Sequence, residues 1–220
     1  MRYFNNFDAL MKLILSMMGG FGNTLLIFCF TLIFSLPLGL ALALLRMSKR
    51  RMISAPISLY ILVMRGTPLM LQIFAIYFAI PTLTGVNLDR MNATILSFSL
   101  NYAAYFAEIF RGGIQSIPVG QHEASQVLGL TKAQTFFHIV LPQVAKRALL
   151  PVSNEVITLV KDTSLANTIA NKEIIMMAKE YSAKGLIWPL FSTALFFLVF
   201  VGALTILFNW AEKKLDYFRC

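Results

Sequence analysis

Long stretches without a charged residue are the feature that most constrains this chain. Residues 13–45, 66–88, 91–107 and 185–211 contain no Asp, Glu, Lys or Arg. A fifth apolar stretch, residues 139–160, is interrupted by only three charged side chains. A helix that crosses the hydrocarbon core of a bilayer needs about 20 largely apolar residues. The pattern therefore predicts an all-α, polytopic membrane protein with five transmembrane helices.

The composition supports this class and excludes several others. Hydrophobic residues make up 58% of the 220 residues and charged residues 13%, with a net charge of +9. An average soluble domain has about a quarter charged residues, so a soluble, basic nucleic-acid-binding protein is excluded. A disordered chain is excluded because such chains lack apolar residues. The two cysteines, Cys29 and Cys220, are too few and too distant in sequence for a disulfide framework.

The first apolar stretch is too long for one transmembrane helix. Gly19, Gly20 and Gly22 are expected to divide it. Before them, apolar residues recur at helical spacing, which predicts a helix over residues 1–20 that lies in the membrane interface. A ragged start to the first span is the alternative, and no cleavable signal peptide is expected because no small-residue cleavage site follows. The expected spans are residues 21–45, 57–80, 91–110, 142–161 and 186–210.

Lys and Arg gather in three segments that predict the orientation. The segments follow the first span, lie between the third and fourth spans, and follow the fifth span. Their basic residues are Arg46, Lys49, Arg50, Arg51, Arg111, Lys132, Lys146, Arg147, Lys213, Lys214 and Arg219. Cytoplasmic loops of membrane proteins carry such an excess of basic residues. The three segments alternate correctly to share one side, so we expect the N-terminus outside and the C-terminus inside.

The loop at residues 117–142 contains the most informative pattern. A short helix is expected over residues 123–128, and Gly129 is expected to end it because glycine is common just after a helix. A second helix is expected over residues 131–140, with the threonine at its start as the N-cap, and is expected to end before Pro142. Two short helices around a glycine would make a compact knob that fits a groove on a partner.

This loop resembles the EAA loop of ABC importer permeases. That pattern has Glu-Ala-Ala, a glycine four residues later, and Ile-x-Leu-Pro after nine more. Ser125 replaces the second alanine and is also small. The resemblance implies a cytoplasmic coupling helix that docks on an ATP-binding subunit. The chain matches the pattern at Glu123, Ala124, Gly129, Ile139, Leu141 and Pro142.

Three more stretches resemble the polar amino-acid uptake branch of these permeases, which imports glutamine, histidine, arginine, cystine and similar amino acids. They are residues 64–68 (MRGTP), 107–113 (AEIFRGG) and 161–165 (KDTSL). The resemblance covers nearly the whole chain. It implies that residues 1–220 form a single ABC permease transmembrane domain of the type I importer fold. The expected location is a bacterial cytoplasmic membrane.

The resemblance also implies the partners. One chain would form half of a permease dimer, with a second copy or a related chain. A dimer of ATP-binding subunits would dock below and an extracytoplasmic solute-binding protein above, and the substrate would be an amino acid; no nucleic-acid partner is expected. The sequence has no G-x-x-x-x-G-K-[ST] phosphate loop, so the chain is expected to bind no ATP or other cofactor and to be no enzyme by itself. ATP-driven motion would reach the spans through residues 123–129.

Ionised side chains inside a membrane cost about 2.5–3.5 kcal/mol, so each needs a reason. Glu155 lies past mid-membrane in the fourth span, beside Asn154. Thr158 and Asp162 follow Glu155 on the same helix face. This polar stripe either lines the substrate path or seals a helix contact, and Asp162 has the further alternative of a helix-end role. A carboxylate on the path would suit the ammonium group of an amino acid.

Arg65 in the second span and Glu108 in the third lie at matching depth, which favours an interhelical ion pair. Alternatively, Arg65 would grip a substrate carboxylate at two points. Gln72 lies seven positions after Arg65 and would either bind substrate or join helices. Asn101 and Tyr102, in the middle of the third span, are further candidates for the path.

Two other functional classes are less consistent with the chain. A secondary transporter or channel would explain the spans but not the helix–glycine–helix loop, and the sequence shows no pair of inverted halves. An intramembrane enzyme would need a nucleophile with a base, or paired metal ligands. The two histidines, His122 and His138, lie in the loop without a second His or Cys at ligand spacing, so no metal site is expected.

Overall fold

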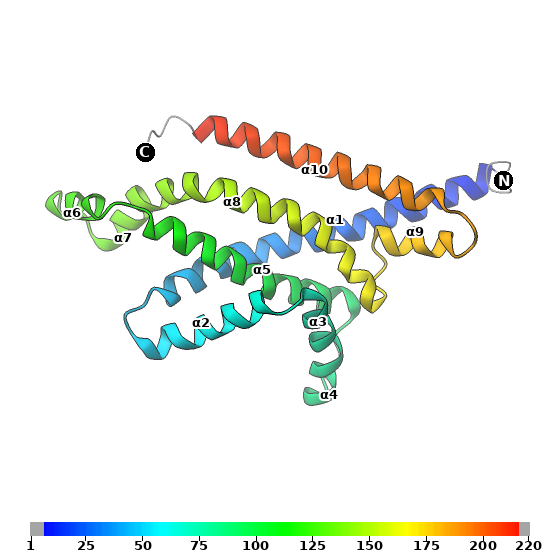
Figure 1. The fold of residues 1–220 in the computed structure, drawn as a ribbon, viewed down its shortest axis with the longest axis horizontal. Coiled ribbons are helices and arrows are strands. Elements are labelled where there is room, and N and C mark those ends of the chain that lie inside the picture. The colour runs from blue at the N-terminus through cyan, green and yellow to red at the C-terminus, as the bar shows by residue number, and fades with distance from the viewer. Residues whose placement is uncertain (1–6, 216–220) are drawn as a thin grey trace.

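Helices alone make up the regular structure of the described residues. The computed structural model describes residues 7–215. Four long helices lie along the long axis of Figure 1: α1 (Phe7–Arg46), α5 (Arg90–Gln115), α8 (Leu141–Asp162) and α10 (Trp188–Leu215). α1 packs most extensively on α5, and α8 packs on both α5 and α10. The expected all-α class is confirmed for this part of the chain.

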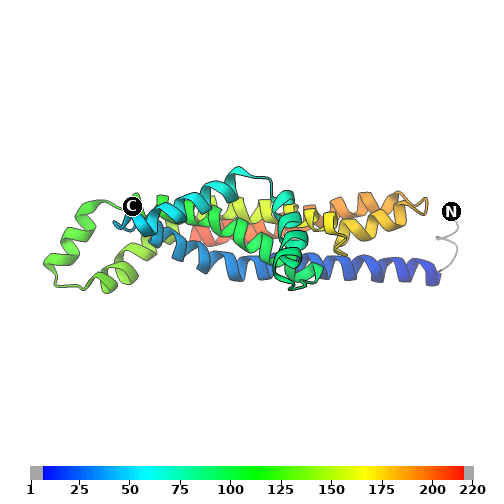
Figure 2. The ribbon, with the colours of Figure 1, turned by 90° about the horizontal axis from the view of Figure 1, so that it is seen from below.

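Short helices occupy the two ends of this bundle. α6 (Val119–Val127) and α7 (Lys132–Gln134) lie at one end. α9 (Ile174–Ser182) lies at the other end, against α1 and α10. Figure 2, a view from below, shows that the bundle is long and narrow with these short helices at opposite ends. The loop with the predicted coupling pattern is therefore separated from α9 by the length of the bundle.

α1 is a single helix of 40 residues, so the expected division at Gly19, Gly20 and Gly22 is wrong. Gly20 serves a close packing contact instead, because a Cβ atom placed there would lie 2.7 Å from Cγ of Met177 in α9. The absence of a side chain at Gly20 lets α9 pack closely on α1. This packing offsets the roughly 1 kcal/mol that glycine costs inside a helix. The described part of the expected interfacial helix is thus continuous with the first span, and residues 1–6 lie outside the described residues.

Small side chains form the seam between α1 and α5. Thr31, Ser35, Gly39 and Ala43 follow one another at four-residue spacing on α1, and the three with side chains are fully buried. A Cβ atom on Gly39 would lie 2.7 Å from Cβ of Phe106 in α5. Membrane helices associate through such small-residue faces because these let two backbones approach closely. The seam therefore has no room for a larger residue at Gly39.

A Gly39→Leu variant is expected to lose stability because its side chain would overlap α5. Overpacking of a close-packed interior costs about 1–3 kcal/mol, so we expect a lower midpoint of thermal unfolding for the purified chain in detergent. Gly22→Leu is the matched control, since nothing described lies within 4 Å of a Cβ atom at that position of the same helix. Equal midpoints for the two variants would contradict the tight seam.

The second apolar stretch, where a span is expected at residues 57–80, is broken in its middle. The helix axis bends by 110° between its two parts. Pro68 has no backbone N–H, and the residue before it, Thr67, is held in an extended conformation, so the helix cannot continue. In Figure 1 the second part projects away from the four long helices. The elements are α2 (Arg51–Gly66), α3 (Leu69–Phe74), the π-helical turn η1 (Ala75–Ala79) and α4 (Ile80–Thr84).

Two of the described helices are by themselves long and apolar enough to cross a membrane, the segment Leu10–Arg46 and α10. The bent pair around Thr67 raises the number to three at most. α5 and α8 are not in this group, and both carry polar side chains in their middle turns, among them Asn101 and Glu155. Membrane crossing by α5 and α8 therefore stays a prediction.

A buried polar turn joins α8 to α9. A 3-10 helix, η3 (Thr163–Ile169), follows α8, and Ala170 then takes a left-handed conformation with φ of 55°. Glu173 is fully buried and accepts hydrogen bonds from the backbone N–H groups of Ile175 (2.7 Å) and Met176 (2.6 Å). Its carboxyl group thus caps α9 and satisfies donors that have no partner within the helix.

Candidate functional site

A polar cavity lies where α5, α8 and the break after α2 meet. Its volume is about 400 Å³, within the range of roughly 300–1,000 Å³ for small-molecule sites in proteins. Five residues that the sequence predicts for a substrate path meet in its wall: Asn101, Tyr102, Glu155, Thr158 and Asp162. The remaining lining residues are Thr67, Pro68, Leu69, Tyr105 and Leu165.

α8 supplies both carboxylates of the cavity. Glu155 and Asp162 lie seven positions apart, about 10 Å along the helix, with Thr158 between them. Asp162 accepts a hydrogen bond from the hydroxyl group of Tyr102 on α5 (2.7 Å). Within the described part of the chain, Glu155 has neither a hydrogen bond nor an ion pair. The cavity therefore holds one carboxylate that is fixed by a neighbour and one that is available to a ligand.

Two amide side chains brace the break that forms one wall of the cavity. A helix that stops leaves backbone carbonyl groups without partners. Gln72 Nε2 donates to the carbonyl oxygens of Met64 (2.9 Å) and Thr67 (3.2 Å). Asn101 Nδ2 donates to the same Met64 oxygen (2.9 Å) and to Oε1 of Gln72 (2.9 Å). Gln72 therefore joins the helices, one of its two expected roles, and does not line the cavity.

Two polar residues of the cavity wall, Thr67 and Tyr105, are not among the residues that the sequence predicts for the substrate path. The Thr67–Pro68 pair is a sequence signal for a break, because the residue before a proline is disfavoured in a helix. Tyr105 lies four positions after Asn101 on α5, a spacing that places both on one face. Asn154, expected on the path, is exposed and does not line the cavity.

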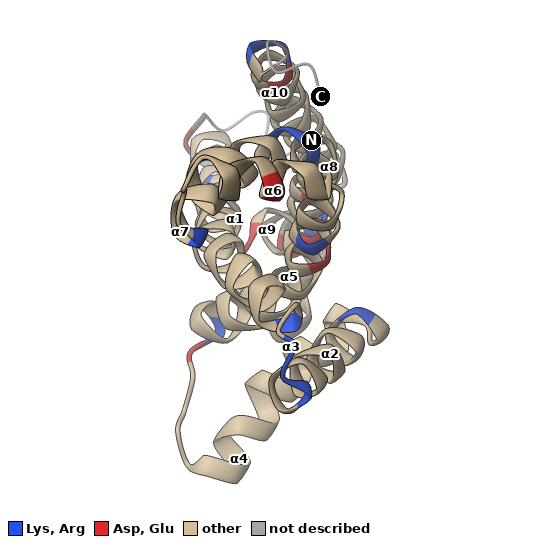
Figure 3. Cartoon of the chain, turned by 90° about the vertical axis from the view of Figure 1, so that its left-hand side faces the viewer, with Lys and Arg blue, Asp and Glu red and all other residues tan. Residues whose placement is uncertain are grey.

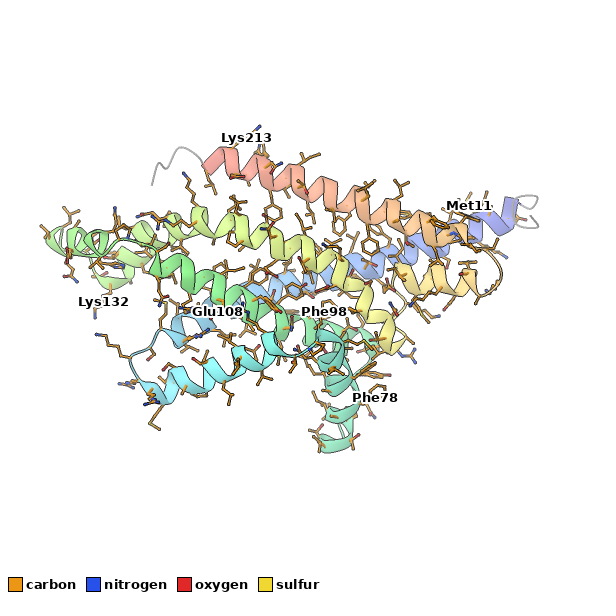
Figure 4. The ribbon with its side chains drawn as sticks, viewed as in Figure 1. Met11, Phe78, Phe98, Glu108, Lys132 and Lys213 are labelled. Atoms are coloured by element: carbon orange, nitrogen blue, oxygen red, sulfur yellow. The ribbon has the colours of Figure 1, made fainter. Side chains whose placement is uncertain are left out.

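Arg65 and Glu108 come together as expected, but within a larger cluster. Nη1 of Arg65 lies 3.7 Å from Oε2 of Glu108. Nη2 of Arg111 lies 2.8 Å from the same oxygen, and Arg46 forms an ion pair with the other oxygen. The Arg65 guanidinium also lies 5.3 Å from the centre of the Tyr105 ring, a cation–π geometry. Figure 4 labels Glu108 where α5 passes α2.

The loop with Glu123 folds into helices on both sides of Gly129, as expected, but the first begins at Val119 and not at Glu123. α6 ends in a Schellman motif: the N–H of Leu130 donates to the carbonyl of Ser125 (3.0 Å), and the N–H of Gly129 donates to that of Gln126 (2.9 Å). Gly129 has a φ of 71° in this turn. Ser125, which replaces the second alanine of the pattern, is buried. The knob is therefore closed by backbone bonds that depend on the glycine.

The second helix of the loop does not end before Pro142, which corrects the prediction. Thr131 caps α7 as expected, with its Oγ1 accepting from the N–H of Gln134 (3.3 Å). The chain then passes through a π-helical turn, η2 (Thr135–Val140), directly into α8. Pro142 lies in the first turn of α8, where a missing N–H is tolerated. The second helix of the loop and the helix that bears both carboxylates are therefore one continuous helical body.

Basic residues lie toward the bundle end that carries α6 and α7. Figure 3 looks onto this end and shows Lys and Arg positions on α2, α7 and α10. The turn between α1 and α2 adds Lys49 and Arg50, whereas Arg219 lies outside the described residues. Within residues 7–215, no three His, Cys, Asp or Glu side chains are grouped as a metal site would require.

A family model described as binding-protein-dependent transport system inner membrane component matches residues 35–217. The L-cystine transport system permease protein TcyB of Bacillus subtilis (strain 168) is 37% identical over 201 residues, covering 90% of this chain and 86% of that relative. The arginine transport system permease protein ArtQ of the same organism is 34% identical over 212 residues, covering 96% and 97%.

Solved structures agree with these relatives. A chain from the crystal structure of an amino acid ABC transporter with histidines superposes with a TM-score of 0.84 at 29% identity, covering 95% of this chain and 98% of that one. A chain of the MetNI methionine ABC transporter in an inward-facing conformation superposes with a TM-score of 0.74 at 16% identity, covering 96% and 99%. The second likeness shows a shared fold.

Proposed function

Because this chain belongs to the family of binding-protein-dependent transport system inner membrane components, it is a permease subunit of an ABC importer, and we propose that a polar amino acid crosses through the cavity at Glu155 and Asp162. The observation that carries the proposal is the unpaired carboxylate of Glu155 in the cavity wall. The relatives named for cystine and arginine transport support an amino acid as the substrate.

The chemistry of the cavity suits the α-ammonium group that amino acids share. Hydrogen bonds between ionised groups are roughly twice as strong as neutral ones. Glu155 would receive the ammonium group, and Thr158 and Asn101 would add neutral polar contacts. Asp162, already held by Tyr102, would add negative charge about 10 Å further along the same helix face. Two carboxylates in one cavity favour zwitterionic and cationic amino acids over acidic ones.

The loop at residues 117–142 would couple ATP hydrolysis to this cavity. The proposed docking knob consists of Glu123, Ala124, Ser125 and Gly129, with Pro142 at its junction to α8. Its support is the EAA-like spacing and the closed turn at Gly129. Because α6 packs on the π-helical turn, and that turn continues into α8, a displacement of the knob would move the helix that bears Glu155. The permease would then switch between inward-facing and outward-facing states as a rigid-body rearrangement.

The assembly would contain two permease chains, either identical or related, and two ATP-binding subunits below them. An extracytoplasmic solute-binding protein would deliver the amino acid from above. ATP would be bound by the separate subunits, with no cofactor and no enzymatic activity of its own in this chain. The proposed topology has five spans, with the N-terminus outside and the C-terminus inside. The grouping of basic residues toward the α6–α7 end supports this orientation.

Uptake into proteoliposomes tests the function. The chain would be reconstituted with its ATP-binding subunits and solute-binding protein, with ATP enclosed, and offered a panel of labelled amino acids. We expect uptake of at least one polar amino acid that requires ATP and the binding protein. Uptake that proceeds without ATP, driven by an ion gradient, would instead establish the alternative of a secondary transporter. A matched preparation without the ATP-binding subunits serves as the control.

A further inference from the structure

Three arginines share one carboxylate in the cluster around Glu108, which leaves positive charge without a partner. Arg46, at the end of α1, Arg65 on α2 and Arg111 on α5 all form ion pairs with Glu108. Three positive charges and one negative charge leave +2. Arg111 also donates to Oε1 of Gln115 (2.6 Å), which is neutral. The ion pairs of the described chain therefore leave the cluster with an excess of positive charge, which the electrostatic attraction between Arg65 and Glu155 offsets only in part.

The cluster has a cavity of its own, distinct from the one at Glu155. Its volume is about 240 Å³, and Arg46, Arg65 and Glu108 contribute to its lining together with Ser58 and Leu62 of α2. The side chains of Arg46 and Arg65 keep 25% and 43% of their surface exposed. Guanidinium groups hold phosphates and carboxylates through two parallel hydrogen bonds. The exposed edges of these two side chains are thus free to hold an anion.

The cluster joins side chains from near the ends of three helices. Arg46 is the last residue of α1, and Glu108 lies seven residues, or about 10 Å, before the end of α5. Long basic side chains near helix ends extend toward the interface. Under the orientation proposed above, Arg46 and the end of α5 lie on the cytoplasmic side, so a phosphate that reaches Arg46 would come from the cytoplasmic leaflet.

The surroundings of the cavity combine apolar and basic surface. Leu59 and Leu62 of α2 are 61% and 68% exposed, and Leu44 and Leu45 of α1 are more than 40% exposed. Residues 46–65 contain five basic residues and no acidic one. Exposed aliphatic side chains suit acyl chains, whereas a basic pocket between membrane helices suits an anionic headgroup.

We propose that Arg46 and Arg65 of this cluster bind the phosphate group of an anionic phospholipid from the cytoplasmic leaflet. Glu108 holds the three guanidinium groups in one place, and their excess charge attracts the lipid phosphate. The acyl chains lie along the exposed leucines of α1 and α2. A bound lipid would bridge α1, α2 and α5 without entering the cavity at Glu155.

Lipid retention by the purified complex of this chain with its ATP-binding subunits tests the site. The complex in detergent is mixed with equal amounts of dioleoylphosphatidylglycerol and dioleoylphosphatidylcholine, and native mass spectrometry measures the ratio of the two lipids retained. We expect the wild type to prefer phosphatidylglycerol. Arg65→Gln should reduce this preference about fivefold, the effect of removing one basic residue near an anionic lipid. Glu108→Gln, which raises the net charge of the cluster, should increase it.

Lys213→Gln is the matched control, because it removes an exposed positive charge at the end of α10, away from the cluster (Figure 4). Equal reductions for Lys213→Gln and Arg65→Gln would overturn the proposal in favour of general surface charge. Loss of the preference when inorganic phosphate is added would also overturn it, since the site would then take free phosphate. If Glu108→Gln does not fold, the Arg65→Lys variant tests the site instead. This variant keeps the positive charge, so it should retain more of the preference for phosphatidylglycerol than Arg65→Gln does. None of these readouts depends on transport.

Discussion

A Glu155→Gln variant of the reconstituted importer is expected to raise the apparent KM for its amino acid about 10- to 100-fold. Glutamine has nearly the same shape as glutamate but no charge. A hydrogen bond to a charged group contributes about 1.5–3 kcal/mol, and each 1.4 kcal/mol corresponds to a factor of ten. Because Glu155 makes no hydrogen bond or ion pair within the described chain, its replacement should leave the fold intact. The measurement is the concentration dependence of ATP-driven uptake.

Two comparisons sharpen this test. Glu212→Gln, which removes an exposed carboxylate near the end of α10, should leave uptake unchanged. Asp162→Asn should change both stability and uptake, because Asp162 also holds the hydroxyl group of Tyr102. An unaltered KM and maximal rate for Glu155→Gln would remove Glu155 from the substrate path.

A Gly129→Val variant is expected to uncouple ATP hydrolysis from transport. Gly129 has a φ of 71°, a conformation that costs other L-residues about 1–2 kcal/mol, and most for a β-branched side chain. That cost should reduce the population of the closed knob about 5- to 30-fold. We expect uptake to fall accordingly, whereas the ATP-binding subunits keep hydrolysing ATP. Both rates are measured in the same proteoliposomes.

The control for this variant lies in the same loop. Gly120→Val adds the same side chain where φ is ordinary and nothing described lies within 4 Å of a Cβ atom, so coupling should survive. Gly129→Asn should be intermediate, since asparagine tolerates the left-handed conformation better than valine. Uptake and hydrolysis that fall in parallel for all three variants would refute a coupling role for the turn.

Backbone preferences and helical spacing within a few residues predicted the helix cap and the helix end in the loop, and the polar face of α8. Thr131 as a cap and Gly129 as a helix end follow from interactions within a few residues, so neighbours in sequence suffice to define them. The common face of Glu155, Thr158 and Asp162 follows from helical spacing alone. Their convergence in one cavity agrees with this spacing, although their contact with substrate stays a prediction.

The same local rules failed where a second helix supplies the reason for a residue. The sequence predicts a break at Gly20, yet this residue allows α9 to pack closely on an unbroken α1. The sequence is compatible with two roles for Gln72, and its bonds to Met64 and Asn101 show that it braces the break. Glu108 was expected to pair with one arginine and pairs with three from different helices.

By itself the sequence determined the membrane class, the helical composition, the family and the turn at Gly129, because these depend on apolar length, periodicity and local backbone preference. The tertiary structure alone decided that Thr67 and Tyr105 join the cavity and that Arg46 joins Glu108. It also decided that the side chain of Gln72 is hydrogen-bonded to the backbone, whereas the carboxylate of Glu155 makes no hydrogen bond or ion pair within the described chain. The physical reason is that the partner of a buried polar group lies on another helix, at a sequence distance that no local pattern encodes.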